Sequence, residues 1–158
     1  MTPEARARLT IDKHLAEAGW LVQDMKSANL GAGLGVAVRE YPTDAGPADY
    51  VLFVDRRPLG VIEAKRDESG ENLTATETQT ERYANATLKW TANRQPLPFL
   101  FEATSHLIRF TDGRDPAPRS REIFHFFQPQ QLAAWAAEPC SLRRRMAEGL
   151  PALDRKSV

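Results

Sequence analysis

The sequence predicts an α/β domain in which a mixed central β-sheet is flanked by helices. Three observations lead to this fold class. Residues 3–19 and 74–89 have helical patterns, runs rich in β-branched and aromatic residues separate and follow them, and 158 residues are enough for one domain with its own core. The order helix, strand, strand, strand, helix, strand is typical of a sheet with helices on its faces.

Composition and charge are those of an ordinary globular protein, with 42% hydrophobic and 27% charged residues. The 21 Lys and Arg residues equal the 21 Asp and Glu residues, so the net charge indicates neither a nucleic-acid-binding nor a membrane-binding protein. The single Cys140 excludes an intrachain disulfide and a cysteine-rich zinc site. Because no apolar run reaches membrane-spanning length and the N-terminus lacks a signal-peptide core, we expect a cytoplasmic protein.

The first elements follow from capping and breaker residues. Thr2 is suited to the N-cap of a helix and Pro3 to its first position. The glycine-rich stretch further on lacks the Lys-Ser/Thr pair of a phosphate-binding loop and the spacing of a dinucleotide fingerprint, so it is expected to be a turn. In order, we expect a helix over 3–19, a short buried segment over 20–22, the turn over 29–35 and a strand over 36–41.

A β-hairpin is predicted at the centre of the chain. Residues 50–54 and 59–62 are rich in strand-forming side chains and are separated by a polar turn over 55–58. Successive side chains of a strand point to opposite faces, so Glu63 and Lys65 share a face. Pairing across the hairpin is expected to bring the upstream Asp49 beside Glu63.

The second half of the chain continues the alternation of helices and strands. Thr74 and Glu77 form a capping box that opens the second helix, and Gln79 and Tyr83 lie four residues apart on one face of it. Beyond this helix we expect strands over 98–103 and 107–110, an irregular basic loop over 115–121, an apolar strand or buried approach over 123–127, and a helix from Pro129 that ends before Pro139. We assign 1–138 to the domain and 139–158 to a linker.

Asp49, Glu63 and Lys65 are the candidate catalytic residues. Hard divalent cations such as Mg²⁺ take oxygen ligands, often one or two carboxylates, and the backbone carbonyl of Ala64 offers a third oxygen. An ammonium beside them lowers the cost of negative charge that develops on a phosphate. The alternative is that Glu63 and Lys65 are the exposed end of an edge strand.

The helix that carries Gln79 and Tyr83 adds two further candidates. Packed across the sheet, it can present Gln79 to a metal-bound water or a phosphate, and Tyr83 to a phosphate or to Lys65. The alternative roles are a solvated Gln79 and a Tyr83 that packs in the core.

The order Asp49, then Glu63-Ala64-Lys65, then Gln79-x-x-x-Tyr83 resembles the PD-(D/E)xK nuclease superfamily. More narrowly, about residues 4–136 resemble the N-terminal nuclease domain of the restriction (R) subunit of type I restriction–modification enzymes. The chain departs from the literal motif in one respect, since Pro47 precedes Asp49 by two positions rather than one. Glu17 and Glu40 receive no role.

This resemblance implies a Mg²⁺-dependent endonuclease of the type I site-specific deoxyribonuclease class, in which Mn²⁺ substitutes for Mg²⁺. Asp49, Glu63 and the Ala64 carbonyl would hold the metal, and Lys65, Gln79 and Tyr83 would act on water or phosphate. The implied partners are double-stranded DNA, an ATP-hydrolysing helicase-like motor in cis, and modification and specificity subunits.

Two alternatives stay open. Arg114, Arg119 and Arg121 either contact DNA or belong to a solvated loop. The rival function is a non-catalytic domain with a nuclease-like fold that docks DNA or the motor.

Overall fold

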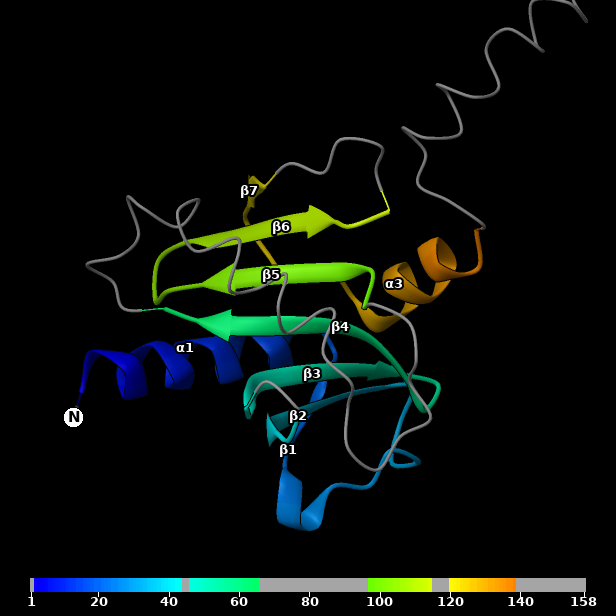
Figure 1. The fold of residues 1–158 in the computed structure, drawn as a ribbon, viewed down its shortest axis with the longest axis horizontal. Coiled ribbons are helices and arrows are strands. Elements are labelled where there is room, and N and C mark those ends of the chain that lie inside the picture. The colour runs from blue at the N-terminus through cyan, green and yellow to red at the C-terminus, as the bar shows by residue number, and fades with distance from the viewer. Residues whose placement is uncertain (1, 44–45, 66–96, 115–119, 139–158) are drawn as a thin grey trace, which may run out of the picture.

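A seven-stranded mixed β-sheet forms the body of the protein (Figure 1). The computed structural model describes residues 2–43, 46–65, 97–114 and 120–138. Neighbouring strands in the sheet follow the order of the chain. They are β1 (Leu21–Asp24), β2 (Gly35–Tyr41), β3 (Ala48–Val54), β4 (Arg57–Ala64), β5 (Phe99–Ala103), β6 (Ile108–Asp112) and β7 (Arg121–Ile123). The predicted α/β class with a mixed sheet is therefore confirmed.

The sheet is mixed because two of its pairings are parallel. β1 pairs with β2, and β4 with β5, in parallel, whereas the other neighbouring strands are antiparallel. The predicted hairpin is β3–β4, but its turn is shorter than the sequence indicated. Asp55 and Arg56 both have positive φ, 50° and 66°, as the tight primed turns of hairpins require, and β4 already begins at Arg57. These positions carry no glycine or asparagine, so the residue types did not indicate so tight a turn.

Helix α1 (Pro3–Glu17) begins where its capping residue predicted. The Thr2 hydroxyl accepts a hydrogen bond from the Ala5 N–H at 3.1 Å. The helix ends two residues before the predicted stop at Gly19, whose φ of 94° lies in the left-handed region that favours glycine. A short 3₁₀ helix, η1 (Met25–Ser27), follows β1.

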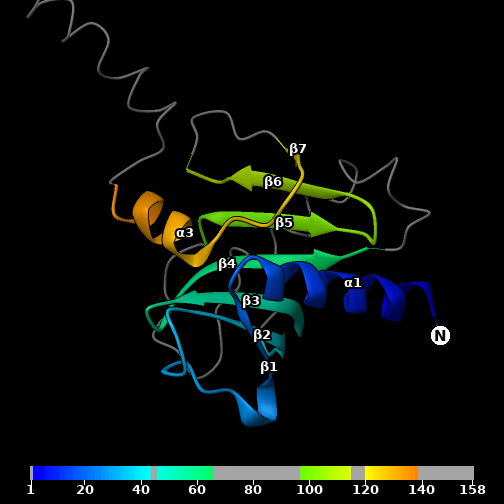
Figure 2. The same cartoon turned by 180° about the vertical axis from the view of Figure 1, so that it is seen from behind.

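Both described α-helices cover the same face of the sheet (Figure 2). α1 contributes Ile11 and Leu15 to the core of this face, and α3 (Pro129–Ala136) contributes Leu132. Aromatic side chains of β5 and β6 and of the segment before α3 fill the space between them. They are Phe99, Phe101, Phe110, Phe126 and Phe127, with Trp135 of α3 packed against them.

A second apolar cluster lies on the opposite face, because side chains alternate along each strand. It includes Val51 and Phe53 of β3, Val61 of β4 and Leu100 of β5. Glu63 is two residues beyond Val61 on β4 and so belongs to this face. The face away from α1 and α3 therefore carries the predicted carboxylate.

Two expectations need correction, and two others concern residues outside the described part of the chain. The apolar run over 123–127 is a strand only up to Ile123, and the Phe124 that follows is 88% exposed. Arg121 begins β7 and is not part of an irregular loop. The helix expected over 74–89 and the linker over 139–158 lie outside the described residues. No helix in the described part of the chain is long and apolar enough to cross a membrane.

Candidate active site

The register of the sheet aligns acidic side chains across neighbouring strands. In the antiparallel β3–β4 ladder Tyr50 lies opposite Ile62, so the next pair toward the strand ends is Asp49 and Glu63. In the parallel β4–β5 ladder Glu63 lies opposite Glu102. We call Asp49, Glu63 and Glu102 the carboxylate row. Strand pairing, rather than proximity in sequence, creates it.

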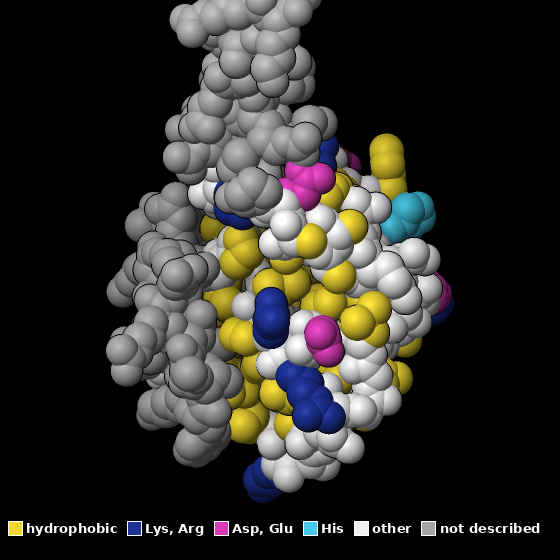
Figure 3. All heavy atoms as spheres, turned by 90° about the vertical axis from the view of Figure 1, so that its right-hand side faces the viewer, with side chains coloured by type: hydrophobic (Ala, Val, Ile, Leu, Met, Phe, Trp, Pro, Cys, Tyr) yellow, Lys and Arg dark blue, Asp and Glu magenta, His cyan; other side chains and the backbone are white. Residues whose placement is uncertain are grey.

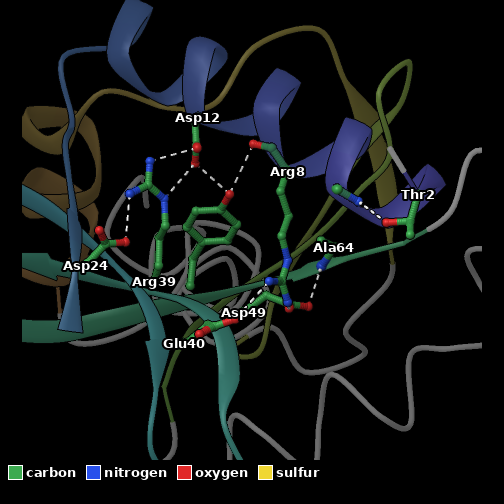
Figure 4. A network of polar contacts seen from close by, with 10 residues as sticks. Thr2, Arg8, Asp12, Asp24, Arg39, Glu40, Asp49 and Ala64 are labelled. Atoms are coloured by element: carbon green, nitrogen blue, oxygen red, sulfur yellow. Dashed lines mark hydrogen bonds and ion pairs between the residues drawn. The ribbon is translucent and has the colours of Figure 1, made fainter. Parts of the chain in front are cut away.

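Asp49 is held by two donors from different parts of the fold (Figure 4). The Ala64 N–H donates to its Oδ2 at 2.9 Å, and Arg8 of α1 donates through Nη2 to its Oδ1. The Asp49 side chain is 14% exposed. A carboxylate with both oxygens engaged has a fixed orientation, and this one is fixed at the end of β4 next to Glu63.

Glu63 and Lys65 lie side by side in a largely buried environment. Lys65 Nζ is 3.7 Å from Glu63 Oε1, and the two side chains are 12% and 9% exposed. Burial and then the Asp49 charge raise the pKa of Glu63 to about 7, with a smaller upward contribution from Glu102, while Lys65 opposes the shift. The alternative in which Glu63 and Lys65 form the exposed end of an edge strand is wrong, since β4 is a central strand between β3 and β5.

Glu102 is a member of the row that sequence reasoning missed. It is 4% exposed and stands in the apolar strand Phe-Leu-Phe-Glu-Ala. An acid inside such a strand was a signal in itself, because a carboxylate is seldom buried without a partner or a function. Its place opposite Glu63 depends on the crossover between β4 and β5, which the sequence did not specify.

Of the other predicted site residues, Arg114 and Arg121 belong to the described part of the chain. Gln79, Tyr83 and Arg119 lie outside the described residues. Arg114 is engaged in packing: its guanidinium bonds both Asp112 oxygens at 3.1 Å, donates to the Trp135 carbonyl at 2.7 Å and stacks on an aromatic ring. These contacts tie β6 to α3.

Arg121 lies over the Phe110 ring at 5.4 Å, on β7 and three strands from β4. Glu17, for which the sequence suggested no role, is the last residue of α1, nine positions beyond Arg8. It lines a surface pocket with His14 and the 123–128 segment, so it does not join the carboxylate row.

The donor set of the row suits a hard divalent cation. It consists of carboxylate oxygens, with the Ala64 backbone beside them, and one or two carboxylates are enough to hold Mg²⁺ in many sites. A cation between Asp49 and Glu63 would also relieve the repulsion that raises the pKa of Glu63. Within the described ranges, no group of three or more His, Cys, Asp or Glu side chains has the geometry of a metal site. The metal-binding roles of Asp49, Glu63 and the Ala64 carbonyl stay predictions.

Comparison with known proteins gives the family. Residues 25–136 match the family model described as the second domain of the type I restriction enzyme EcoKI endonuclease subunit. The type I restriction enzyme EcoKI endonuclease subunit of Escherichia coli (strain K12) is 39% identical over 75 residues, which cover 40% of this chain and 6% of that protein. No solved structure matches. With most of its length matched by the family model, the chain belongs to the family of type I restriction enzyme endonuclease subunits, in the region of their second domain.

Proposed function

We propose that this chain is the metal-dependent endonuclease domain of a type I restriction enzyme R subunit and hydrolyses phosphodiester bonds of double-stranded DNA. The observation that carries the proposal is the convergence of Asp49, Glu63 and Lys65 at the ends of β3 and β4. Their order along the chain is the PD-(D/E)xK order, and the family supplies the restriction-enzyme context.

Each residue has a distinct role in this proposal. Asp49 and Glu63 hold Mg²⁺, for which Mn²⁺ substitutes, together with the Ala64 carbonyl. The bound ion supplies Lewis acidity to the phosphate and lowers the pKa of the attacking water. The Lys65 ammonium, fixed beside Glu63, donates hydrogen bonds to the phosphate oxygens as negative charge builds on them. Gln79 and Tyr83 are proposed to orient water or phosphate.

The wider assembly is also part of the proposal. The relative is an endonuclease subunit of a type I restriction enzyme, and the matched part is a small fraction of it. We assign to the rest of the machine an ATP-driven helicase-like motor in cis, which translocates DNA, and modification and specificity subunits, which choose the site.

The charge distribution supports delivery of DNA by such partners. Non-specific DNA affinity comes mainly from Lys and Arg side chains that displace counterions, and here 21 of them are matched by 21 acids. On the face shown in Figure 3 the described Lys and Arg side chains lie singly among hydrophobic ones and form no continuous band. The chain alone is therefore expected to bind duplex DNA at the weak end of the non-specific range, about 10⁻⁴ M.

The decisive experiment separates cleavage from movement in the complete enzyme. Lys65→Ala in the full-length subunit, assembled with its partners, should abolish DNA cleavage and leave ATP hydrolysis unchanged. Lys13→Ala, which removes an exposed lysine from α1, is the matched control and should retain both activities. Loss of ATP hydrolysis together with cleavage in Lys65→Ala would contradict the proposal.

One observation favours the rival docking domain. Both oxygens of Asp49 already accept hydrogen bonds from the protein, from Arg8 and from the Ala64 N–H. A purely structural carboxylate would look the same. Calorimetric titration with Mn²⁺ discriminates between the two functions. Only a nuclease should bind the ion, lose that affinity in Asp49→Ala and Glu63→Ala, and keep it in Lys65→Ala.

A further inference from the structure

Arg8 of α1 is placed between two acidic side chains of neighbouring strands. The β2–β3 register pairs Arg39 with Tyr50 and Tyr41 with Ala48, so Glu40 stands opposite Asp49. The Arg8 guanidinium joins the two: Nη1 lies 2.9 Å from Glu40 Oε1, and Nη2 donates to Asp49 Oδ1 (Figure 4). Two acids in directly opposite positions of a sheet repel each other, and this cation offsets the repulsion.

The backbone at Glu40 indicates that this arrangement is enforced. Glu40 has a φ of 51°, in the left-handed region that a residue with a Cβ adopts at a cost of about 1 kcal/mol. Such strained positions persist where surrounding contacts over-determine them, and they gather at functional sites. The Glu40 side chain is 64% exposed, so it has room to follow the Arg8 guanidinium while its backbone stays in place.

The contact sets up a competition at Asp49. Its Oδ2 accepts from the Ala64 N–H, which is part of the sheet end, whereas its Oδ1 accepts from a long side chain that is 40% exposed. A divalent ion bound to Asp49 and the permanently charged Arg8 guanidinium would contact the same carboxylate and would repel each other. Of the two donors, the Arg8 side chain is the one that is free to leave.

We propose that Arg8 is a positioning residue that acts as the resident counter-cation of Asp49: it holds the carboxylate in place before metal loading and moves aside, still bound to Glu40, when a divalent ion binds. This inference rests on the proposed metal site at Asp49 and Glu63. It makes the site selective for doubly charged ions, because a singly charged ion is attracted to Asp49 and Glu63 about half as strongly and so competes less well with the Arg8 charge.

The test is Mn²⁺ affinity, measured by calorimetry on the 158-residue chain at physiological salt. Arg8→Gln keeps a donor for Asp49 and removes the charge, so it should bind Mn²⁺ about tenfold more tightly than the wild type, the lower end of what one charged hydrogen bond contributes. Arg8→Lys keeps the charge and should stay near the wild-type affinity. Arg6→Gln removes an exposed charge from the same helix and should change the affinity by no more than about twofold, because salt screens it.

Each outcome of these titrations supports or overturns the counter-cation role of Arg8. Equal or weaker binding in Arg8→Gln, or an equal gain in Arg8→Lys, overturns the counter-cation role. If Asp49→Asn abolishes binding in that case, the metal site itself stands. If neither the wild type nor Arg8→Gln binds Mn²⁺ at millimolar concentration, the metal site fails as well.

A second measurement does not depend on any variant folding. The Arg8 Nε–Hε resonance of the wild type should shift during Mg²⁺ titration, with a midpoint equal to that of a calorimetric titration with Mg²⁺. A resonance that stays in place while the metal binds would overturn the proposal.

Discussion

Two polar clusters of the fold differ in how their charges are arranged, and Figure 4 shows the first of them. In the first, Arg39 reaches Asp12 through two nitrogens, at 2.8 and 3.3 Å, and Asp24 through a third at 2.9 Å. The buried Tyr50 hydroxyl donates to Asp12 at 2.6 Å. The second cluster is the carboxylate row, in which Glu63 is flanked by Asp49 and Glu102 with Lys65 beside it.

The arrangement decides where each cluster titrates. Hydrogen bonds to Asp12 raise the pKa of Arg39, and burial followed by the Asp12 bond raises the pKa of Tyr50, so both groups move further from neutral pH. In the row, burial and a like charge bring the pKa of Glu63 to about 7. A cluster built for stability keeps its protonation state, whereas a buried carboxyl group whose pKa is brought near neutrality is typical of a functional site.

The largest expected effect is a loss of stability of the chain when the first cluster is broken. Asp12→Ala removes the main partner of Arg39 and the closer of two acceptors of the buried Tyr50 hydroxyl, the other being the Arg8 carbonyl at 3.2 Å. The free energy of unfolding should therefore fall by about 2 kcal/mol. Asp24→Ala is the control: its carboxylate is 68% exposed and its loss should cost about 0.5 kcal/mol. Urea unfolding measures both, and equal losses would mean that the hydrogen bond from the Tyr50 hydroxyl to Asp12 contributes nothing.

The carboxylate row should make the stability of the chain depend on pH. Between its ordinary value of 4.5 and about 7, the Glu63 carboxyl binds a proton in the folded chain but not in the unfolded one. The metal-free chain therefore loses stability as pH rises through this window. Glu63→Gln should remove the dependence and stabilise the chain at pH 8 by about 1 kcal/mol. Glu17→Gln, at an exposed position of α1, should keep it; a wild type whose stability rises from pH 5 to 8 while Glu63→Gln stays flat would reverse our assignment.

The smallest effect distinguishes the two neighbours of Glu63. Asp49 raises the pKa of Glu63 more than Glu102 does. Asp49→Asn should therefore lower that pKa further than Glu102→Gln, for which we expect a decrease of less than about one unit. The ¹³Cδ resonance of Glu63, followed in an NMR titration, gives both values. A larger shift in Glu102→Gln would place the main repulsion on the β5 side of the row.

Much of the sheet could be read from local patterns. Two runs of strand-forming residues around a polar turn predicted the β3–β4 hairpin, and Thr2 with Pro3 predicted the start of α1. The period of two along a strand also placed Glu63 and Lys65 on one face, with Asp49 close by. Each of these features depends on the conformation of a few consecutive residues, which the side chains themselves favour.

Tertiary structure decided which distant residues join that site. Glu102 lies next to Glu63 only because β5 pairs in parallel with β4, and Arg8 reaches Asp49 only because α1 packs on the face that Tyr50 shares. Nothing in the neighbouring sequence of Glu102 or Arg8 determines these positions. The register of a sheet and the position of a helix on it are set by the burial of the whole apolar surface. A contact between residues 41 positions apart, such as that of Arg8 with Asp49, therefore follows from packing rather than from the sequence around either residue.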